Sequence, residues 1–164
     1  MTKNAYLQEI EAAEQDLQFS DFDRNEAWRL GCTLRSAALA QGLPLVIGIT
    51  IGKQRVFHTA LPGATPDNDL WLERKAAVVT HFERSSMGVG EQFRSLGRVF
   101  EEDSRLPMPR YAANGGVFPV RLKDSGLVVG TVGVSGLPQK DDHAFLVQQL
   151  RAFLCEKPAS ATAG

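Results

Sequence analysis

The sequence predicts an α/β (α+β) protein, a three-layer α/β/α sandwich with a mostly antiparallel sheet. Two pairs of apolar, β-branched segments are each separated by a short turn, as in β-hairpins. Segments with apolar residues at helical spacing precede, separate and follow these pairs. No glycine-rich loop leads from a strand into a helix, which argues against a doubly wound nucleotide-binding sheet.

Length and composition indicate a single domain over residues 1–164. Of the 164 residues, 43% are hydrophobic and 23% are charged, so one hydrophobic core and an ordinary globular composition are expected. The core should span about residues 16–156, and the small, polar residues 157–164 should form a flexible tail.

The N-terminal part is expected to contain two helices joined by an extended segment. Apolar spacing predicts a first helix over residues 4–15, and residues 17–22 indicate a short extended piece. Asp23 can cap a second helix over Arg24–Gln41, which Gly42 ends. The apolar side of the second helix should consist of Trp28, Leu30, Leu34, Ala38 and Leu39.

A hairpin and a central helix are expected next. Residues 45–51 and 55–61 are the two predicted strands, and Gly52 begins their turn because glycine tolerates positive φ. The run Thr65-Pro66-Asp67 is typical of a helix start, with a cap, a first-turn proline and an acid at the positive end of the helix dipole. This helix should continue to about Glu83.

The central helix should break at residues 85–88, and a shorter helix over about 89–96 should follow. Residues 103–116 are rich in proline, asparagine and glycine and are expected to form a loop. The double glycine Gly115-Gly116 at its end serves either as a tight turn or as a place where backbone N–H groups approach a ligand.

A second hairpin is predicted over residues 117–122 and 127–134. Gly130, Gly133 and Gly136 lie within or at the end of its second strand, where glycine admits close approach of another backbone. A last helix should run from about 140 to 156, with Asp141 as its cap and Asp142 at its positive end. Its buried residues should be Leu146, Val147, Leu150, Phe153 and Leu154.

The charge and the apolar pattern exclude several partners. A net charge of −1 without a basic stripe argues against nucleic acid and against an anionic membrane surface. The longest apolar run, Leu43–Ile51, is too short to cross a bilayer, and the N-terminal residues do not resemble a secretion signal. Cys32 and Cys155 are expected to be reduced thiols. We therefore expect a cytoplasmic protein.

The central helix carries polar residues on the side that should face protein. At about 100° per residue, one stripe collects Asp67, Trp71, Arg74, Val78, His81 and Ser85, while Asp69, Glu73, Thr80 and Glu83 lie opposite. A buried cation needs a partner, so Arg74 should meet an internal carboxylate, a second subunit or a ligand anion. For His81, a hydrogen-bonded core histidine is the favoured interpretation.

A second set of polar residues lies near the start of the last predicted helix. Asp142 and His143 lie there, a few positions after Ser135. Capping explains the acid without any chemistry, and no Gly-x-Ser-x-Gly elbow accompanies the serine, which argues against nucleophilic catalysis. His58, His81 and His143 have no metal-binding spacing, so no metal site is predicted.

Ordered motifs over about residues 22–154 resemble the haem-degrading-domain (HbpS-like) family, including GlcG and the PduO C-terminal domain. The matching motifs are Leu30-Gly31, Leu45-Val46-Ile47, Phe57-His58-Thr59-Ala60-Leu61-Pro62-Gly63, Pro66-Asp67-Asn68, Trp71, Arg74-Lys75, Phe82, Ser85-Ser86, Gly115-Gly116-Val117-Phe118-Pro119-Val120, Val134-Ser135-Gly136-Leu137-Pro138-Gln139 and Asp142-His143. The resemblance implies a profilin-like fold with about five strands, the fifth at residues 17–20, and a homo-oligomer. Haem is the cofactor that the resemblance suggests, but the sequence identifies no axial ligand.

Two main functional hypotheses follow. In the first, the protein binds a small ligand or tetrapyrrole, with Arg74 and Lys75 holding an anionic group and the 115–116 loop closing over it. In the second, the polar stripe joins the subunits of a homo-oligomer without ligand chemistry; an enzyme of unknown reaction is third. The expected ligand-binding residues are Asp67, Asn68, Trp71, Arg74, Lys75, His81, Ser85, Ser86, Gly115, Gly116, Asp142 and His143.

Overall fold

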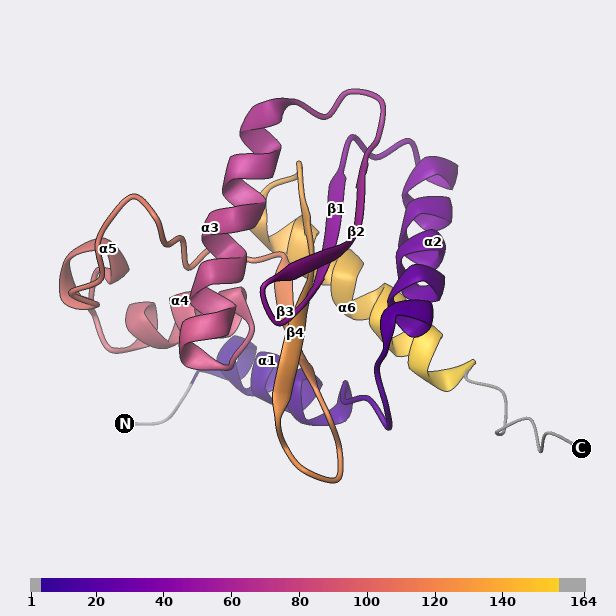
Figure 1. Cartoon of the computed structure of the whole chain (residues 1–164). Helices are drawn as coiled ribbons and strands as arrows, with labels where there is room; N and C mark the ends of the chain where they lie inside the picture. Colours follow the sequence, from indigo (N-terminus) through magenta and orange to yellow (C-terminus); the bar gives the residue numbers. More distant parts are fainter. Residues whose placement is uncertain (1–3, 157–164) are drawn as a thin grey trace, which may run out of the picture.

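The computed structural model describes residues 4–156 (Figure 1). Over this range the chain forms six helices and four strands. In chain order these are α1 (Ala5–Asp16), α2 (Arg24–Ala40), β1 (Val46–Ile51), β2 (Gln54–Ala60), α3 (Pro66–Phe82), α4 (Ser86–Ser95), α5 (Phe100–Asp103), β3 (Val117–Arg121), β4 (Val128–Ser135) and α6 (Gln139–Cys155). The α+β class and both hairpins are as predicted.

The four strands form one antiparallel sheet in the order β2-β1-β4-β3. The side chains of β4 alternate between its faces: Val132 and Val134 lie in the main core, whereas Thr131, Gly133 and Ser135 face the other way. This alternation directs the hydroxyl-bearing end of β4 toward α3.

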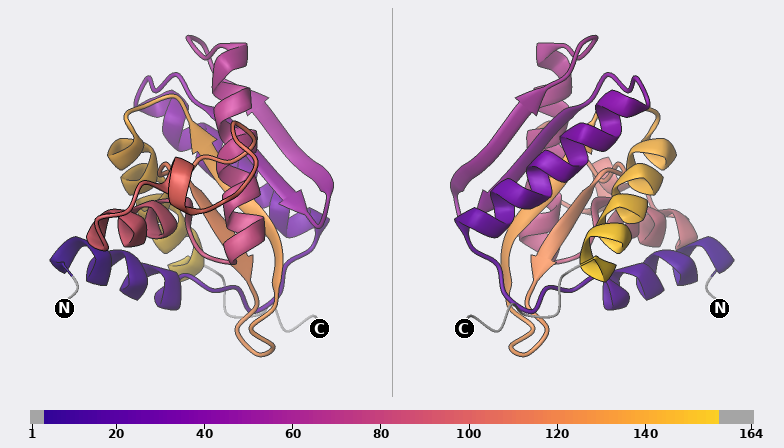
Figure 2. Two further views of the ribbon diagram at one scale, coloured as in Figure 1. Left: turned by 90° about the vertical axis from the view of Figure 1, so that its left-hand side faces the viewer. Right: turned by 90° about the vertical axis from the view of Figure 1, so that its right-hand side faces the viewer.

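Helices cover both faces of the sheet. In Figure 2, α2 and α6 lie across one face and α3 lies across the other, with α4 and α5 beside it. The main core lies between the sheet and α2 and α6 and includes Leu34, Ile47 and Leu146. A smaller apolar cluster that includes Val46 and Leu72 joins α3 to the sheet. No helix within residues 4–156 is long and apolar enough to span a membrane.

The expectation of a fifth strand at residues 17–20 is wrong, because this segment forms only an isolated parallel bridge between Phe19 and Leu122. Phe19 N–H donates to the Arg121 carbonyl and the Phe19 carbonyl accepts from the Lys123 N–H, both at 2.8 Å, and pairing then ends. Along the edge of β3 that does not pair with β4, the next residue whose backbone could pair with residues 17–20 is Pro119. Proline has no N–H to donate. At Val117 the hydroxyl of Ser86 already occupies the backbone edge, at 3.1 Å from the amide nitrogen.

Several helix boundaries and faces differ from the sequence expectations. Asp23 caps α2 as predicted, accepting from the Glu26 N–H at 2.8 Å, but Trp28 and Leu39 on that helix are exposed. Helix α4 begins three residues earlier than predicted because Ser85 caps it, and α5 was not predicted.

The last helix also differs from the prediction at its start and on its buried face. The α6 N-cap is Pro138 rather than Asp141. Of the five apolar residues expected to be buried in α6, Val147 and Leu154 are only half-buried. The predicted tail, 157–164, lies outside the described residues.

The strand glycines of β4 do admit close approach of other chain segments. A Cβ at Gly130 would lie 1.9 Å from the Thr50 carbonyl oxygen, and one at Gly133 would lie 2.5 Å from a methyl group of Val117. Gly136 has φ +154°, and a Cβ there would lie 2.3 Å from the Pro44 carbonyl oxygen. The sheet can therefore pack tightly at the end where β4 leads into α6.

Candidate functional site

The face of α3 that points inward differs from the predicted stripe. Its buried residues are Leu72, Lys75, Val78 and Val79. Arg74 is half-buried and its guanidinium lies 5.5 Å from the ring centroid of Trp71, while His81 is exposed. The expectation that Arg74 and His81 point inward is wrong, because α3 rests on the sheet through Leu72 and Val79 and this contact turns the neighbouring Lys75 inward.

Lys75 is the buried cation of the central helix, and all of its hydrogen-bonding capacity is used internally. Its side chain is 2% exposed, and Nζ donates to the Val134 carbonyl at 2.8 Å, to the Gly115 carbonyl at 3.1 Å and to Asp142 Oδ2 at 3.1 Å. An ammonium group has three donors, so none remains for a ligand. Lys75 therefore positions the chain around it and does not hold a ligand anion.

The Asp142 carboxylate completes this buried ion pair. Its Oδ1 accepts from the Leu137 N–H at 3.0 Å, and its Oδ2 accepts from the Gly136 N–H at 3.4 Å. Burial lowers the pKa of the Lys75 ammonium and raises the pKa of the Asp142 carboxyl, and the attraction between the two charges opposes both shifts. The pair thus joins α3, α6, the end of β4 and the loop before β3.

The double glycine makes room for this ion pair. A Cβ at Gly116, whose φ is +133°, would lie 2.5 Å from Lys75 Nζ and 2.6 Å from the Val134 carbonyl. A Cβ at Gly115 would lie 2.4 Å from the Gln139 carbonyl. The close approach predicted for these glycines is therefore to the lysine and to α6.

His143 lies in the second turn of α6, with a side chain buried beside Phe118 at a ring-centroid distance of 5.8 Å. Among the described residues its Nδ1 finds no hydrogen-bond partner. Burial lowers the pKa of this imidazole from 6.5 to about 4, so the ring is neutral at physiological pH. His143 is part of the protein interior and does not line the pocket described next.

A polar cavity of about 240 Å³ lies where the N-terminal ends of α3 and α6 meet the end of β4 and the loop before β3. We call it the α3–α6 pocket. It is lined by Asp67, Asn68, Trp71, Asn114, Gly115, Ser135, Gly136, Leu137, Gln139 and Asp142. Asp142 of the buried ion pair is part of this lining, whereas Lys75 is not.

Four polar side chains line the α3–α6 pocket without a hydrogen bond to the described part of the protein, and one of them is the Asp67 carboxylate. Within residues 4–156, the Trp71 indole N–H, the Asn114 amide and the Ser135 hydroxyl make no hydrogen bond. Ser135 is only 3% exposed, so its hydroxyl can reach little besides the contents of the pocket. Unpaired buried polar groups are unfavourable unless water or a ligand satisfies them.

The structure brings together five of the predicted ligand-binding residues on this pocket: Asp67, Asn68, Trp71, Gly115 and Asp142. Sequence reasoning missed Asn114, Ser135 and Gln139 as site residues. The available signal was weak, since Asn114 only adjoins the double glycine, and the other two lie in a motif noted for its family resemblance.

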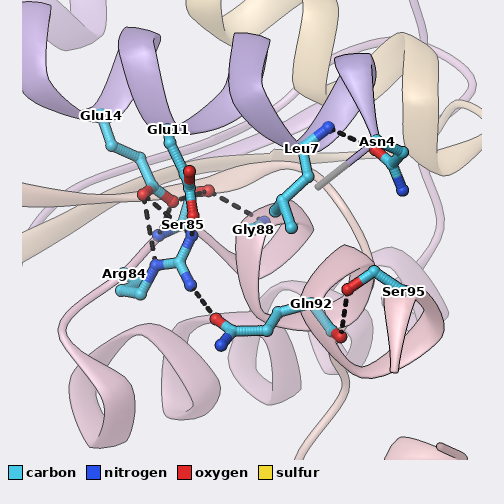
Figure 3. A network of polar contacts seen from close by, with 9 residues as sticks. All are labelled: Asn4, Leu7, Glu11, Glu14, Arg84, Ser85, Gly88, Gln92 and Ser95. Carbon is cyan, nitrogen blue, oxygen red and sulfur yellow. Dashed lines mark hydrogen bonds and ion pairs between the residues drawn. The ribbon is translucent and has the colours of Figure 1, made fainter. Parts of the chain in front are cut away.

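Ser85 and Ser86 lie away from the pocket and have structural roles. Figure 3 shows Ser85 at the centre of a network that ties α1 to α4. Its Oγ donates to Glu14 Oε1 at 2.5 Å and accepts from the Gly88 N–H at 3.0 Å. Arg84 binds the other oxygen of Glu14 through two nitrogens, each at 3.2 Å, and also contacts Gln92.

A larger cavity of about 490 Å³ borders this network and includes Glu11, Glu14, Arg84 and Arg121 in its lining. Its two arginines are already engaged: Arg84 binds Glu14, and Arg121 donates to the carbonyls of Gly126 and Glu83. Among the described residues that line this cavity, neither arginine is therefore free of protein partners. Nowhere in residues 4–156 do three histidine, cysteine or acidic side chains gather in a metal-binding cluster.

The comparisons with known proteins agree with this architecture. The family model described as haem degrading protein HbpS-like matches residues 22–151. A UPF0303 protein of Streptomyces avermitilis is 47% identical over 148 residues, which is 90% of each chain. The crystal structure of the Ybr137w protein is 29% identical with a TM-score of 0.84, covering 92% of this chain and 88% of that one. A PduOC:heme complex is 17% identical with a TM-score of 0.66, covering 80% and 94%, and shares the fold.

The fold and the site define an α+β protein with a polar pocket between two helices and the end of an antiparallel sheet. The chain belongs to the haem degrading protein HbpS-like family. This membership confirms the resemblance inferred from the sequence motifs.

Proposed function

We propose that this chain is a haem-related small-ligand-binding module whose ligand contacts the α3–α6 pocket. The observation that carries the proposal is the convergence of unpaired polar groups from Trp71, Asn114 and Ser135 on one cavity. The buried Lys75–Asp142 pair holds the surrounding segments in place, so the pocket is organised before a ligand arrives.

The size of the pocket constrains how a tetrapyrrole would bind. Small-molecule sites usually measure about 300–1,000 Å³, and this pocket measures about 240 Å³. A tetrapyrrole would therefore insert only an edge, with its ring resting on the exposed surfaces of Trp71 and Leu70. PduOC, a protein of the same fold, forms a complex with heme, which supports haem as the first ligand to test.

Haemin is expected to bind saturably at Trp71. The chain has two tryptophans, so a Trp28→Phe variant leaves Trp71 as the only indole reporter. Titration with haemin should shift the Soret band and quench the Trp71 fluorescence with the same midpoint. Trp71→Ala should weaken binding about tenfold or more, because aromatic anchors dominate binding energy.

Trp28→Ala is the matched control, since Trp28 is 63% exposed on α2, which covers the opposite face of the sheet. This variant should bind haemin as the wild type does. An unsaturable Soret change, or one that is equal in wild type and Trp71→Ala, would remove tetrapyrrole binding at this pocket.

Self-association is a second candidate function, favoured by the outer face of α3. Leu70 is 48% exposed and Trp71 is 37% exposed. Next to Leu70, a groove of about 390 Å³ runs between α3 and the loop at Pro109 and Arg110. Exposed apolar side chains rimmed by charged ones are typical of interaction surfaces.

If this face joins subunits, light scattering should give a mass that is a multiple of 17.9 kDa. Leu70→Glu should then reduce the mass to that of the monomer, because it places a charge in an apolar contact. Leu39→Glu, on the equally exposed surface of α2, is the control and should leave the mass unchanged. A wild-type monomer would rule out this assembly.

A further inference from the structure

We infer that the α3–α6 pocket binds the carboxylate of a small organic acid at the N-terminus of α6. The inference rests on the proposed function, because it concerns the same pocket. Helix α6 has 17 residues and begins at Gln139 after Pro138, whose side chain cannot cap it. The backbone N–H groups of Gln139 and Lys140 have no acceptor among the described residues. Such a helix end attracts anions through its free N–H groups and its dipole.

The Ser135 side chain is the independent second observation. Ser135 ends β4 on the face toward α3, is 97% buried and lines the pocket, and it makes no hydrogen bond within residues 4–156. Its oxygen stays accessible from the pocket, where water or a ligand can satisfy it. A ligand oxygen in the pocket can accept a hydrogen bond from it.

Three further side chains of the pocket carry hydrogen-bond donors. The Trp71 indole N–H can only donate, and the Asn114 amide carries two N–H donors. The Gln139 side chain accepts from the Gly115 N–H at 3.3 Å through its oxygen, which leaves its NH₂ group to donate. The Asp142 carboxylate does not oppose an anion, because Lys75 neutralises it and its oxygens already accept hydrogen bonds.

Asp67 sets the selectivity of the site. It is the one carboxylate on the pocket lining, among the described residues, that lacks a cationic partner. It would repel a second negative charge and would accept a hydrogen bond from a hydroxyl group. The cavity of about 240 Å³ also limits the ligand to a small molecule. The expected ligand class is therefore a short monocarboxylic acid with a hydroxyl substituent.

The test compares three acids of similar size in the Trp28→Phe background, by Trp71 fluorescence and by calorimetry. Lactate should bind best, propionate should bind more weakly because it has no hydroxyl, and malonate should bind least because of Asp67. Ser135→Ala should weaken lactate binding about tenfold, as expected for a hydrogen bond to a charged group. Ser36→Ala, at an exposed position of α2, is the control and should leave the affinity for lactate unchanged.

Malonate provides a second, independent measurement. Asp67→Asn should raise malonate affinity several-fold relative to lactate, because the repelling charge is gone. Asp69→Asn is the matched control, since it removes an equal charge from the same turn of α3 at a residue that binds His58 at 2.7 Å. This control should leave the preference for lactate over malonate intact.

The outcomes separate this inference from the proposed function. Saturable haemin binding without binding of any of the three acids would overturn the carboxylate site and leave the ligand-binding module standing. Acid binding that Ser135→Ala does not weaken would also overturn the site, as would preferential binding of methylammonium. Lactate binding without haemin binding would support the carboxylate site and reject the tetrapyrrole as the ligand.

Discussion

Replacing Lys75 by methionine is expected to lower the free energy of unfolding by about 3–5 kcal/mol, the usual cost of breaking a buried ion pair from one side. The side chains of Lys75 and Asp142 are only 2% and 3% exposed, and their charged atoms are 3.1 Å apart. Without the ammonium group, the carboxylate stays buried and two carbonyl groups lose their donor. Urea denaturation at neutral pH measures the change.

Two further variants identify the cause of this loss. Arg74→Met, one position earlier on the same helix, should change stability by about 0.5 kcal/mol or less, because Arg74 is half-buried and forms no ion pair within residues 4–156. The double variant Lys75→Met/Asp142→Asn should recover part of the stability, since it removes both charges. An equal loss for Lys75→Met and Arg74→Met would show that the ion pair has no special role.

The protein is expected to lose about 3 kcal/mol of stability as the pH falls from about 6.5 to about 4, through His143 alone. In the folded state the pKa of this imidazole is about 4, and its ordinary value is 6.5. Between these pH values the unfolded chain binds a proton that the folded chain does not. The contribution of His143 to the free energy of unfolding is therefore fully present above about pH 6.5, and it decreases as the pH falls toward about 4.

Denaturation curves across this pH range test the prediction with His143→Phe. Phenylalanine keeps a ring beside Phe118 and removes the buried Nδ1 that lacks a partner, so the variant should show a flatter pH dependence than the wild type. His81→Phe changes an exposed histidine and should retain the wild-type slope. A wild-type slope in His143→Phe would assign the acid sensitivity to other groups.

Local signals in the sequence account for most of the secondary structure. Asp23 caps α2 and Thr65-Pro66 begins α3 as predicted, because a cap depends on residues within one helical turn. Both hairpins were also predictable, since their strands lie close in sequence. The fifth strand was not, because its pairing stops at Pro119 and at the hydroxyl of Ser86, which comes from a different part of the chain.

The candidate site was only partly predictable. A helical wheel suggested an inward-facing cation on the central helix, and the structure contains one, but the residue is Lys75 rather than Arg74. Adjacent residues differ by about 100° around a helix, so the rotation of α3 about its axis decides which of the two faces inward. That rotation depends on Leu72 and Val79 packing against the sheet, which no property of the helix alone reveals.

The sequence by itself determined most of the helices and strands, the caps that begin α2 and α3, and membership of the HbpS-like family. Hydrogen bonds and side-chain periodicity within a few residues are enough to specify the secondary structure and the caps, and ordered motifs along the chain carry the family membership. Only the tertiary structure decided which polar groups are buried and which meet in a pocket. Lys75 and Asp142 are 67 positions apart, and Trp71 and Ser135 reach the same cavity from different elements. Contacts between such distant segments arise from the packing of helices on the sheet.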